Sequence, residues 1–204
     1  MGFLSATTSL TRYRVEGKLE NPVMEYVYTG LTRNAISDID DNAAERAIGW
    51  TAFNDPFVPT FEGSSFTIGT YFLFSLRIDK KTIPAKVIQK YYAIELYKKR
   101  KASGREFLSR NEKKMIKEHV INLLTLRIPA TPNIYNVLWN HEGESLWFFT
   151  NLKSGCEELE TLFLTSFHLK LIRLFPYTMT EFDGKLSGEE YDTFSRLTPS
   201  TLME

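Results

Sequence analysis

The spacing of apolar residues divides the first part of the chain into strands and one helix. Residues 9–17, SLTRYRVEG, alternate between apolar and polar side chains and end at a glycine, which is typical of a strand. Residues 22–33 have helical spacing, with Pro22 in the first turn. A loop containing Pro and Gly then leads to FTIGTYFLFSLRI, residues 66–78, which we expect to form a further strand.

The middle of the chain predicts two amphipathic helices in a hairpin. The first begins at Pro84 and extends to about Lys101, and Ser103-Gly104 interrupts it. The second begins at Ser109-Arg110-Asn111-Glu112, which fits an S-x-x-E capping box. Apolar residues then recur three and four positions apart along this helix: Met115, Ile116, Val120, Leu123 and Leu124.

The last part of the chain returns to strands. NIYNVLWN and SLWFFTN, residues 133–140 and 145–151, predict a hairpin of aromatic strands around a polar turn. An amphipathic helix over residues 153–167 and an alternating strand over residues 168–176 follow. The tail from residue 181 is acidic and has only a weak pattern.

These elements predict an α+β fold in which two strand/helix halves bracket a basic helical hairpin. We expect one domain over residues 1–180, with the helical insertion at about residues 84–126, and an acidic tail over residues 181–204. The resemblance between the two halves is too loose to indicate a repeat.

Composition excludes several classes of protein. The 204 residues are 43% hydrophobic and 25% charged, which are ordinary globular values. No apolar run approaches the roughly 18 residues of a membrane helix, and the N-terminal residues fit neither a signal peptide nor a myristoylation motif. The only cysteine, Cys156, cannot form an internal disulfide or a cysteine-cluster metal site. We therefore expect a soluble, cytoplasmic protein with no membrane partner.

The charge of this formally neutral chain is strongly segregated. Residues 77–127 contain 15 Lys+Arg and 5 Asp+Glu, whereas residues 1–76 contain 5 and 9, and residues 128–204 contain 5 and 11. A basic middle between two acidic ends favours a polyanionic partner for the middle segment.

Duplex DNA is the polyanion that such a segment fits, because it carries a phosphate charge about every 1.7 Å and each neutralised phosphate releases counterions. An ordinary solvated helix face would have acidic residues interleaved with the basic ones, and residues 97–119 contain only Glu106, Glu112 and Glu118. Because no sequence-reading motif is present, we expect contact with the duplex backbone. The candidate contacts are Lys98, Lys99, Arg100, Lys101, Arg105, Arg110, Lys113, Lys114 and Lys117.

Catalysis has weaker support. Asp38, Asp40, Asp41 and Glu45 could bind a divalent cation in the manner of nuclease carboxylates, but a turn with a helix cap explains the same cluster. The three histidines, His119, His141 and His168, are scattered along the chain, and no nucleophile elbow, P-loop or dinucleotide fingerprint occurs. We expect no enzyme activity, no cofactor and no metal. A metal-dependent nuclease and a protein-interaction module without DNA binding remain the alternatives.

A family resemblance joins several of these features. Residues 83–140 contain a proline-started helix, a Lys/Arg-rich connection, a second helix with NEKKMIKEHVINLL, Arg127 after the last leucine, and a strand ending in Trp139-Asn140. Together with AIGW at residues 47–50 and SLWFFTNLKSGCEELETLFLTSFHLKLIRLFP at residues 145–176, this order resembles the recombination-associated RdgC family over roughly residues 9–180.

The resemblance implies a DNA-binding α+β protein without established catalysis, which dimerises into a ring around duplex DNA and limits access of the RecA recombinase. It further implies association with the nucleoid, and it assigns Arg127 to the DNA path near the closing contact of the ring. Longer members of the family have an aromatic residue two positions after this arginine, where the present chain has Pro129.

Overall fold

One antiparallel sheet joins the two halves of the chain. The computed structural model describes residues 3–63, 65–175, 178–179, 182 and 187–197. The sheet has the strand order β2-β4-β5-β6-β1-β7, and β3 pairs with β4. Its strands are β1 (Thr11–Glu16), β2 (Arg46–Ala52), β3 (Thr67–Ile68), β4 (Tyr71–Lys80), β5 (Thr131–Asn140), β6 (Ser145–Phe148) and β7 (Lys170–Arg173).

The two halves interleave within this sheet. β1 belongs to the first half but lies between β6 and β7 of the second, so that Tyr13 is opposite Leu146 on one side and Arg173 on the other. All pairs between the strands that the structure describes are antiparallel, and one isolated parallel bridge joins Ala35 to Trp50 of β2. The predicted α+β class is therefore confirmed, with the halves fused into a single sheet.

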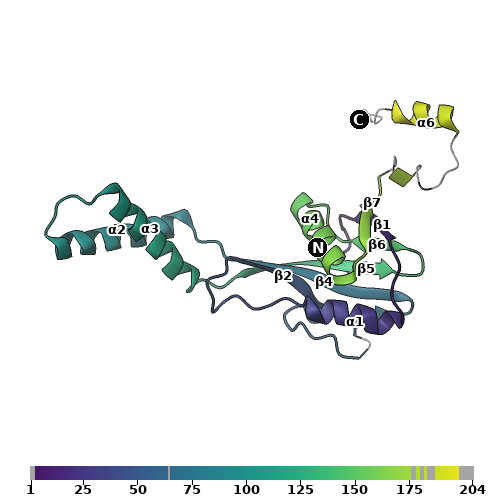
Figure 1. The fold of residues 1–204 in the computed structure, drawn as a ribbon, viewed down its shortest axis with the longest axis horizontal. Coiled ribbons are helices and arrows are strands. Elements are labelled where there is room, and N and C mark those ends of the chain that lie inside the picture. Colours follow the sequence, from purple (N-terminus) through teal and green to yellow (C-terminus); the bar gives the residue numbers. More distant parts are fainter. Residues whose placement is uncertain (1–2, 64, 176–177, 180–181, 183–186, 198–204) are drawn as a thin grey trace.

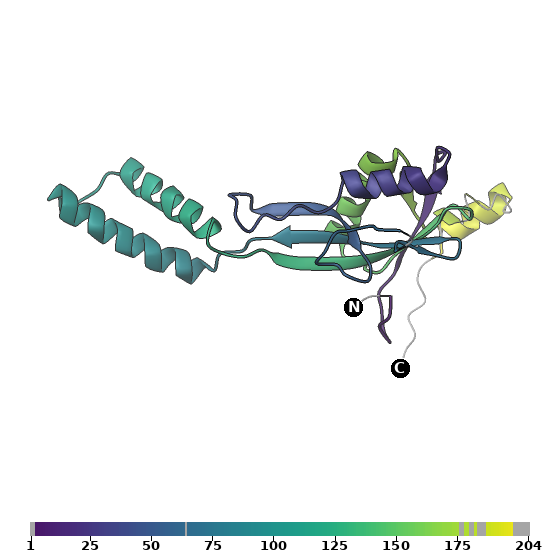
Figure 2. The ribbon, with the colours of Figure 1, turned by 90° about the horizontal axis from the view of Figure 1, so that it is seen from below.

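Two helices, α1 (Val23–Arg33) and α4 (Lys153–Phe167), cover one face of the sheet (Figure 2). The core between them is aromatic: the rings of Trp139 and Phe163 are 4.9 Å apart, and those of Phe163 and Phe167 are 4.8 Å apart. The buried indole of Trp50 donates a 2.8 Å hydrogen bond to Ser166 Oγ. Burial of these large side chains holds α4 on the sheet.

The opposite face of the sheet is covered only in part. Phe3 packs edge-on against Phe53 and Phe149, and its backbone N–H donates to Asn136 Oδ1 at 2.9 Å. Further along this face Trp147 is 38% exposed.

A pair of antiparallel helices, α2 (Ala85–Ser103) and α3 (Arg110–Thr125), projects beyond one end of the sheet (Figures 1 and 2). We call residues 85–125 the arm. It is inserted between β4 and β5, which pair with each other from Tyr71↔Asn140 to Lys80↔Thr131. The arm therefore begins and ends at neighbouring points of the sheet.

The C-terminal tail contains a helix, α6 (Gly188–Ser195), at the other end of the molecule from the arm (Figure 1). Ser187 and Glu190 form a complete capping box at its start. An S-x-x-E signal at residues 187–190 thus marks a helix start within the tail, whose apolar residues show only a weak pattern. The expected domain boundary at residues 180–181 lies outside the described residues.

Candidate nucleic-acid interface

The arm is exposed over most of its surface. No residue of α2 is buried, and α3 buries only Val120, Leu124 and Thr125. Leu108, in the connection between the helices, is also buried. The two helices thus share a thin apolar seam, and most other side chains of the arm face solvent.

The tip of the arm has defined geometry. α2 ends at Gly104, which has φ 63° and adopts the left-handed conformation that glycine permits. The predicted capping box is present, since Ser109 Oγ accepts the N–H of Glu112 at 3.2 Å and Glu112 Oε2 accepts the N–H of Ser109 at 2.8 Å. The backbone N–H of Ser109, then its side chain, lowers the pKa of the Glu112 carboxyl, and the Arg105 and Lys99 cations act in the same direction.

All of the basic residues predicted from the sequence are exposed, except Lys113, which is half-buried. Nine of them lie between residues 98 and 117, in the outer part of the arm, and Arg127 follows the end of α3. They do not form one face.

α3 carries a compact basic stripe. Arg110, Lys113, Lys114 and Lys117 are spaced at i, i+3, i+4 and i+7, so that they share one side of the helix. We call these four residues the α3 stripe. Its two ends are two helical turns apart, about 10 Å along the helix axis.

The α2 cations are dispersed instead. Lys98, Lys99, Arg100 and Lys101 are consecutive, and successive helical residues diverge by about 100°. Lys98 and Lys99 line a groove between the helices. The other residues that line this groove are Glu95, Ala102, Glu112, Met115, Ile116 and His119.

Carboxylates compensate few of these cations. Lys98 pairs with Glu95 at 2.7 Å, Lys114 with Glu118 at 3.8 Å, and Arg105 with Glu112 at 3.9 Å. Such exposed pairs contribute little, typically about 0 to 1 kcal/mol each. Within the described part of the chain, no ion pair is found for the others: Lys99, Arg100, Lys101, Arg110, Lys113, Lys117 and Arg127.

Two exposed cations of the arm lie outside the set predicted from the sequence. Lys86 and Lys90 lie four residues apart on α2 and extend the positive charge toward the sheet. Their i, i+4 spacing on a predicted helix is the pattern by which the sequence could have identified them as a further basic pair on one side of α2. Conversely, Arg77 and Lys81 belong to the basic segment but are withdrawn from solvent, the first by a bidentate pair with Asp79 at 2.6 and 2.8 Å.

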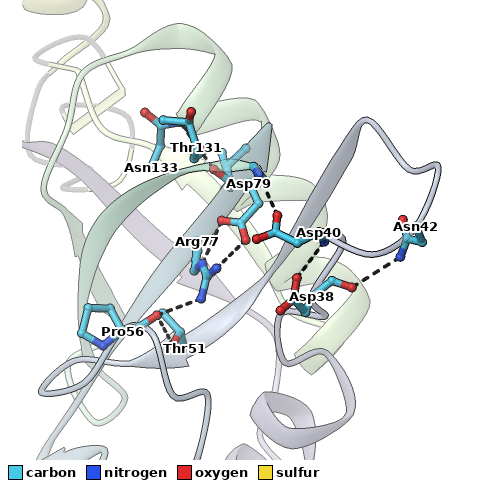
Figure 3. Close-up of polar contacts among 11 residues, drawn as sticks. Asp38, Asp40, Asn42, Thr51, Pro56, Arg77, Asp79, Thr131 and Asn133 are labelled. Carbon is cyan, nitrogen blue, oxygen red and sulfur yellow. Dashed lines mark hydrogen bonds and ion pairs between the residues drawn. The ribbon is translucent and has the colours of Figure 1, made fainter. Parts of the chain in front are cut away.

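The acidic cluster forms a turn at the base of the arm (Figure 3). Asp38 Oδ1 accepts the backbone N–H of Asp40 at 2.8 Å, and Asp40 Oδ1 accepts the N–H of Ala130 at 2.7 Å. No helix follows, because β2 begins at Arg46; the expected helix cap is therefore wrong and the expected turn is correct. We call residues 38–45 the root turn.

The other candidate chemical groups lie on separate elements. His119 is on α3, His141 Nδ1 lies 3.1 Å from the carbonyl of Thr70, and His168 ends α4. Cys156 is buried within α4, where it packs in the core. Among the described residues, no group of three or more His, Cys, Asp or Glu side chains could hold a metal ion.

No helix in the described part of the chain has the length and apolar character required to cross a membrane. A search of curated proteins found no match to this chain. A family model described as "Putative exonuclease, RdgC" matches residues 8–168, a span that contains the complete sheet except β7, together with the arm, α1 and α4. The resemblance noted in the sequence is thereby confirmed, and the chain belongs to the RdgC family.

Proposed function

We propose that this protein binds duplex DNA through the arm, without reading its sequence. Membership of the RdgC family fits a role related to recombination. The observation that carries the proposal is the set of exposed arm cations without carboxylate partners, including Arg110 and Lys117 of the α3 stripe. Clustered, uncompensated cations on a projecting element suit a phosphate backbone.

The finer parts of the proposal come from the family resemblance. We propose a homodimer that encloses or clamps the duplex, is associated with the nucleoid, and limits access of the RecA recombinase to DNA. Arg127, at the base of α3, would face the DNA path.

We further propose that the protein acts by binding and does not cut DNA. The support is that the carboxylates of Asp38 and Asp40 already accept backbone hydrogen bonds within the root turn. Incubation of end-labelled duplex with the protein and Mg²⁺ or Mn²⁺ is expected to leave the label at full length. Metal-dependent shortening of the label would instead favour the nuclease alternative.

The decisive experiment for binding is a salt-titrated affinity measurement on duplexes of unrelated sequence and on single strands, combined with light scattering. For six phosphate contacts, log affinity should fall with log salt at a slope of about −5, equally for all duplex sequences. A flat salt response would overturn the proposal. Absence of DNA binding at low salt, with dimers in the scattering data, would favour the protein-interaction alternative.

A further inference from the structure

A buried lysine lies where the arm leaves the sheet. Lys81 directly follows β4 and is 6% exposed. Its ammonium donates to three backbone carbonyls, those of Asp40 at 3.0 Å, Asn42 at 2.8 Å and Thr125 at 2.8 Å. An ammonium has three protons, so all its donors are used. Lysine is rarely buried without a carboxylate partner, and none of these acceptors is a carboxylate.

The three carbonyls come from two separate parts of the fold. Asp40 and Asn42 belong to the root turn, whereas Thr125 is the last residue of α3. The last carbonyls of a helix have no partner within the helix and carry its partial negative charge. Lys81 therefore ties the end of the arm to the body of the protein at a site where a cation is favoured.

The root turn also holds both connections of the arm. The backbone N–H of Lys81 donates to the carbonyl of Glu45 at 2.9 Å, on the outgoing connection. The Asp40 carboxylate accepts from Ala130 at 2.7 Å, on the returning connection. Residues 81–84 and 126–130 are the only covalent links between arm and sheet, so these contacts fix the point about which the arm could tilt.

We propose that Lys81 is a positioning residue that sets the direction of the arm relative to the sheet. Without the ammonium, three carbonyls in this confined site lose their donor, and hydrating them requires the base of α3 to separate from the root turn. The tetrahedral ammonium suits three acceptors around one point, which the planar guanidinium of arginine does not. Its effect on DNA binding rests on the proposed function, whereas its effect on the arm does not.

The direct test measures the direction of the arm. Spin labels at Asn111→Cys on α3 and Thr161→Cys on α4, both exposed positions, report the arm-to-body distance by double electron–electron resonance. The buried Cys156 can remain. We expect a narrow distance distribution in the parent and a clearly broader one in Lys81→Met. The matched control is Lys80→Met, which removes the same charge from the exposed neighbouring residue and should leave the distribution narrow.

An unchanged distribution in Lys81→Met would overturn the proposal. Circular dichroism checks that this variant is folded. If it does not fold, Lys81→Gln retains two donors and is measured in its place; a width equal to that of the parent then overturns the proposal, and a broader one supports it.

Duplex binding provides the second measurement. Lys81→Met should weaken affinity roughly threefold to tenfold, because a tilting arm must be ordered on binding. The slope of log affinity against log salt should stay unchanged, because the buried amine contacts no phosphate. A shallower slope would assign Lys81 to the DNA contacts and contradict the positioning role. If the parent binds no DNA, the proposed function fails, and the spin-label distances still decide the role of Lys81.

Discussion

The carboxylate of Asp40 accepts a 2.7 Å hydrogen bond from the backbone N–H of Ala130, 90 residues further along the chain. One residue is in the root turn and the other immediately precedes β5. An acidic cluster that could be interpreted as a metal site from sequence thus serves to hold a chain segment at the base of the arm.

Replacing Asp40 with alanine should therefore destabilise the protein. Because this hydrogen bond is exposed to solvent, its loss predicts a decrease of about 0.5–1.5 kcal/mol in the free energy of unfolding. Urea denaturation of the parent and the variant measures this change in the free energy of unfolding. Asp41→Ala, at the exposed neighbour, is the control and should change stability by less than about 0.5 kcal/mol. Equal effects of the two substitutions would contradict the assigned role of Asp40.

Charge reversal in the α3 stripe should remove DNA binding without unfolding the protein. Arg110 and Lys117 are both exposed, and Glu at position 110 suits the first turn of a helix. The double variant Arg110→Glu/Lys117→Glu should lose at least about tenfold in duplex affinity, with a salt slope shallower by about 2. Fluorescence anisotropy over a salt series measures both quantities.

The control for this variant reverses the same number of charges on the body of the protein. Lys18→Glu/Lys170→Glu changes two exposed lysines outside the arm and should keep the parental salt slope. If both double variants lost affinity to the same extent, overall charge and not the α3 stripe would account for binding.

The capping box at the tip of the arm should show a specific pH dependence. The pKa of Glu112 is lowered in the folded protein, chiefly by the backbone N–H of Ser109. Its contribution to stability is therefore present above the unfolded-state pKa, about 4.3, and disappears as pH falls through the lowered value. Ser109→Ala keeps this backbone N–H and removes the side-chain contribution, so the Glu112 pKa should rise part of the way to its ordinary value, as measured by carboxyl chemical shifts in an NMR titration.

Ser103→Ala is the matched control for that titration. The Ser103 hydroxyl donates to the carbonyl of Arg100 at 3.3 Å and lies on the other helix of the arm. The Ser103→Ala substitution should leave the Glu112 pKa unchanged. An equal rise in both variants would show that general loosening of the arm, and not the capping box, controls the carboxyl.

Contact between α1 and α4 predicts a contrast between two glycines. A Cβ at Gly30 would lie 2.5 Å from the ring of Phe167, whereas a Cβ at Gly155 would have its nearest neighbour at 3.6 Å. Gly30→Ala should therefore cost about 1–3 kcal/mol through overpacking. Gly155→Ala should be neutral or stabilising by up to about 1 kcal/mol, since alanine favours a helix. Thermal unfolding compares the two, and similar melting temperatures would contradict the close helix contact.

Local patterns in the sequence predicted the elements well, because each signal depends on neighbouring residues. The capping box at Ser109 set the start of α3 correctly, and the strand expected over residues 66–78 contains most of β4. The helical spacing of Lys113, Lys114 and Lys117 likewise predicts that these cations share one side of α3.

Long-range relationships could not be obtained in this way. Nothing local indicates that β1 lies between β6 and β7, since strand order depends on which surfaces pack together. The hydrogen bonds of Lys81 to Asp40 and Thr125 likewise join residues 41 and 44 positions apart. In sequence, Lys81 could not be distinguished from the exposed cations around it.

The arm is inserted between two strands that pair with each other, so the evolutionary constraint on the sheet is separate from the constraint on the arm. β4 and β5 would remain a continuous hairpin if a tight turn replaced the arm, so their pairing does not fix its length or composition. The aromatic core thus leaves the length of the projecting helices unrestricted, whereas the proposed DNA contact restricts their charge. Differences in length among relatives should accordingly concentrate in this insertion, with the residues at its junction varying least.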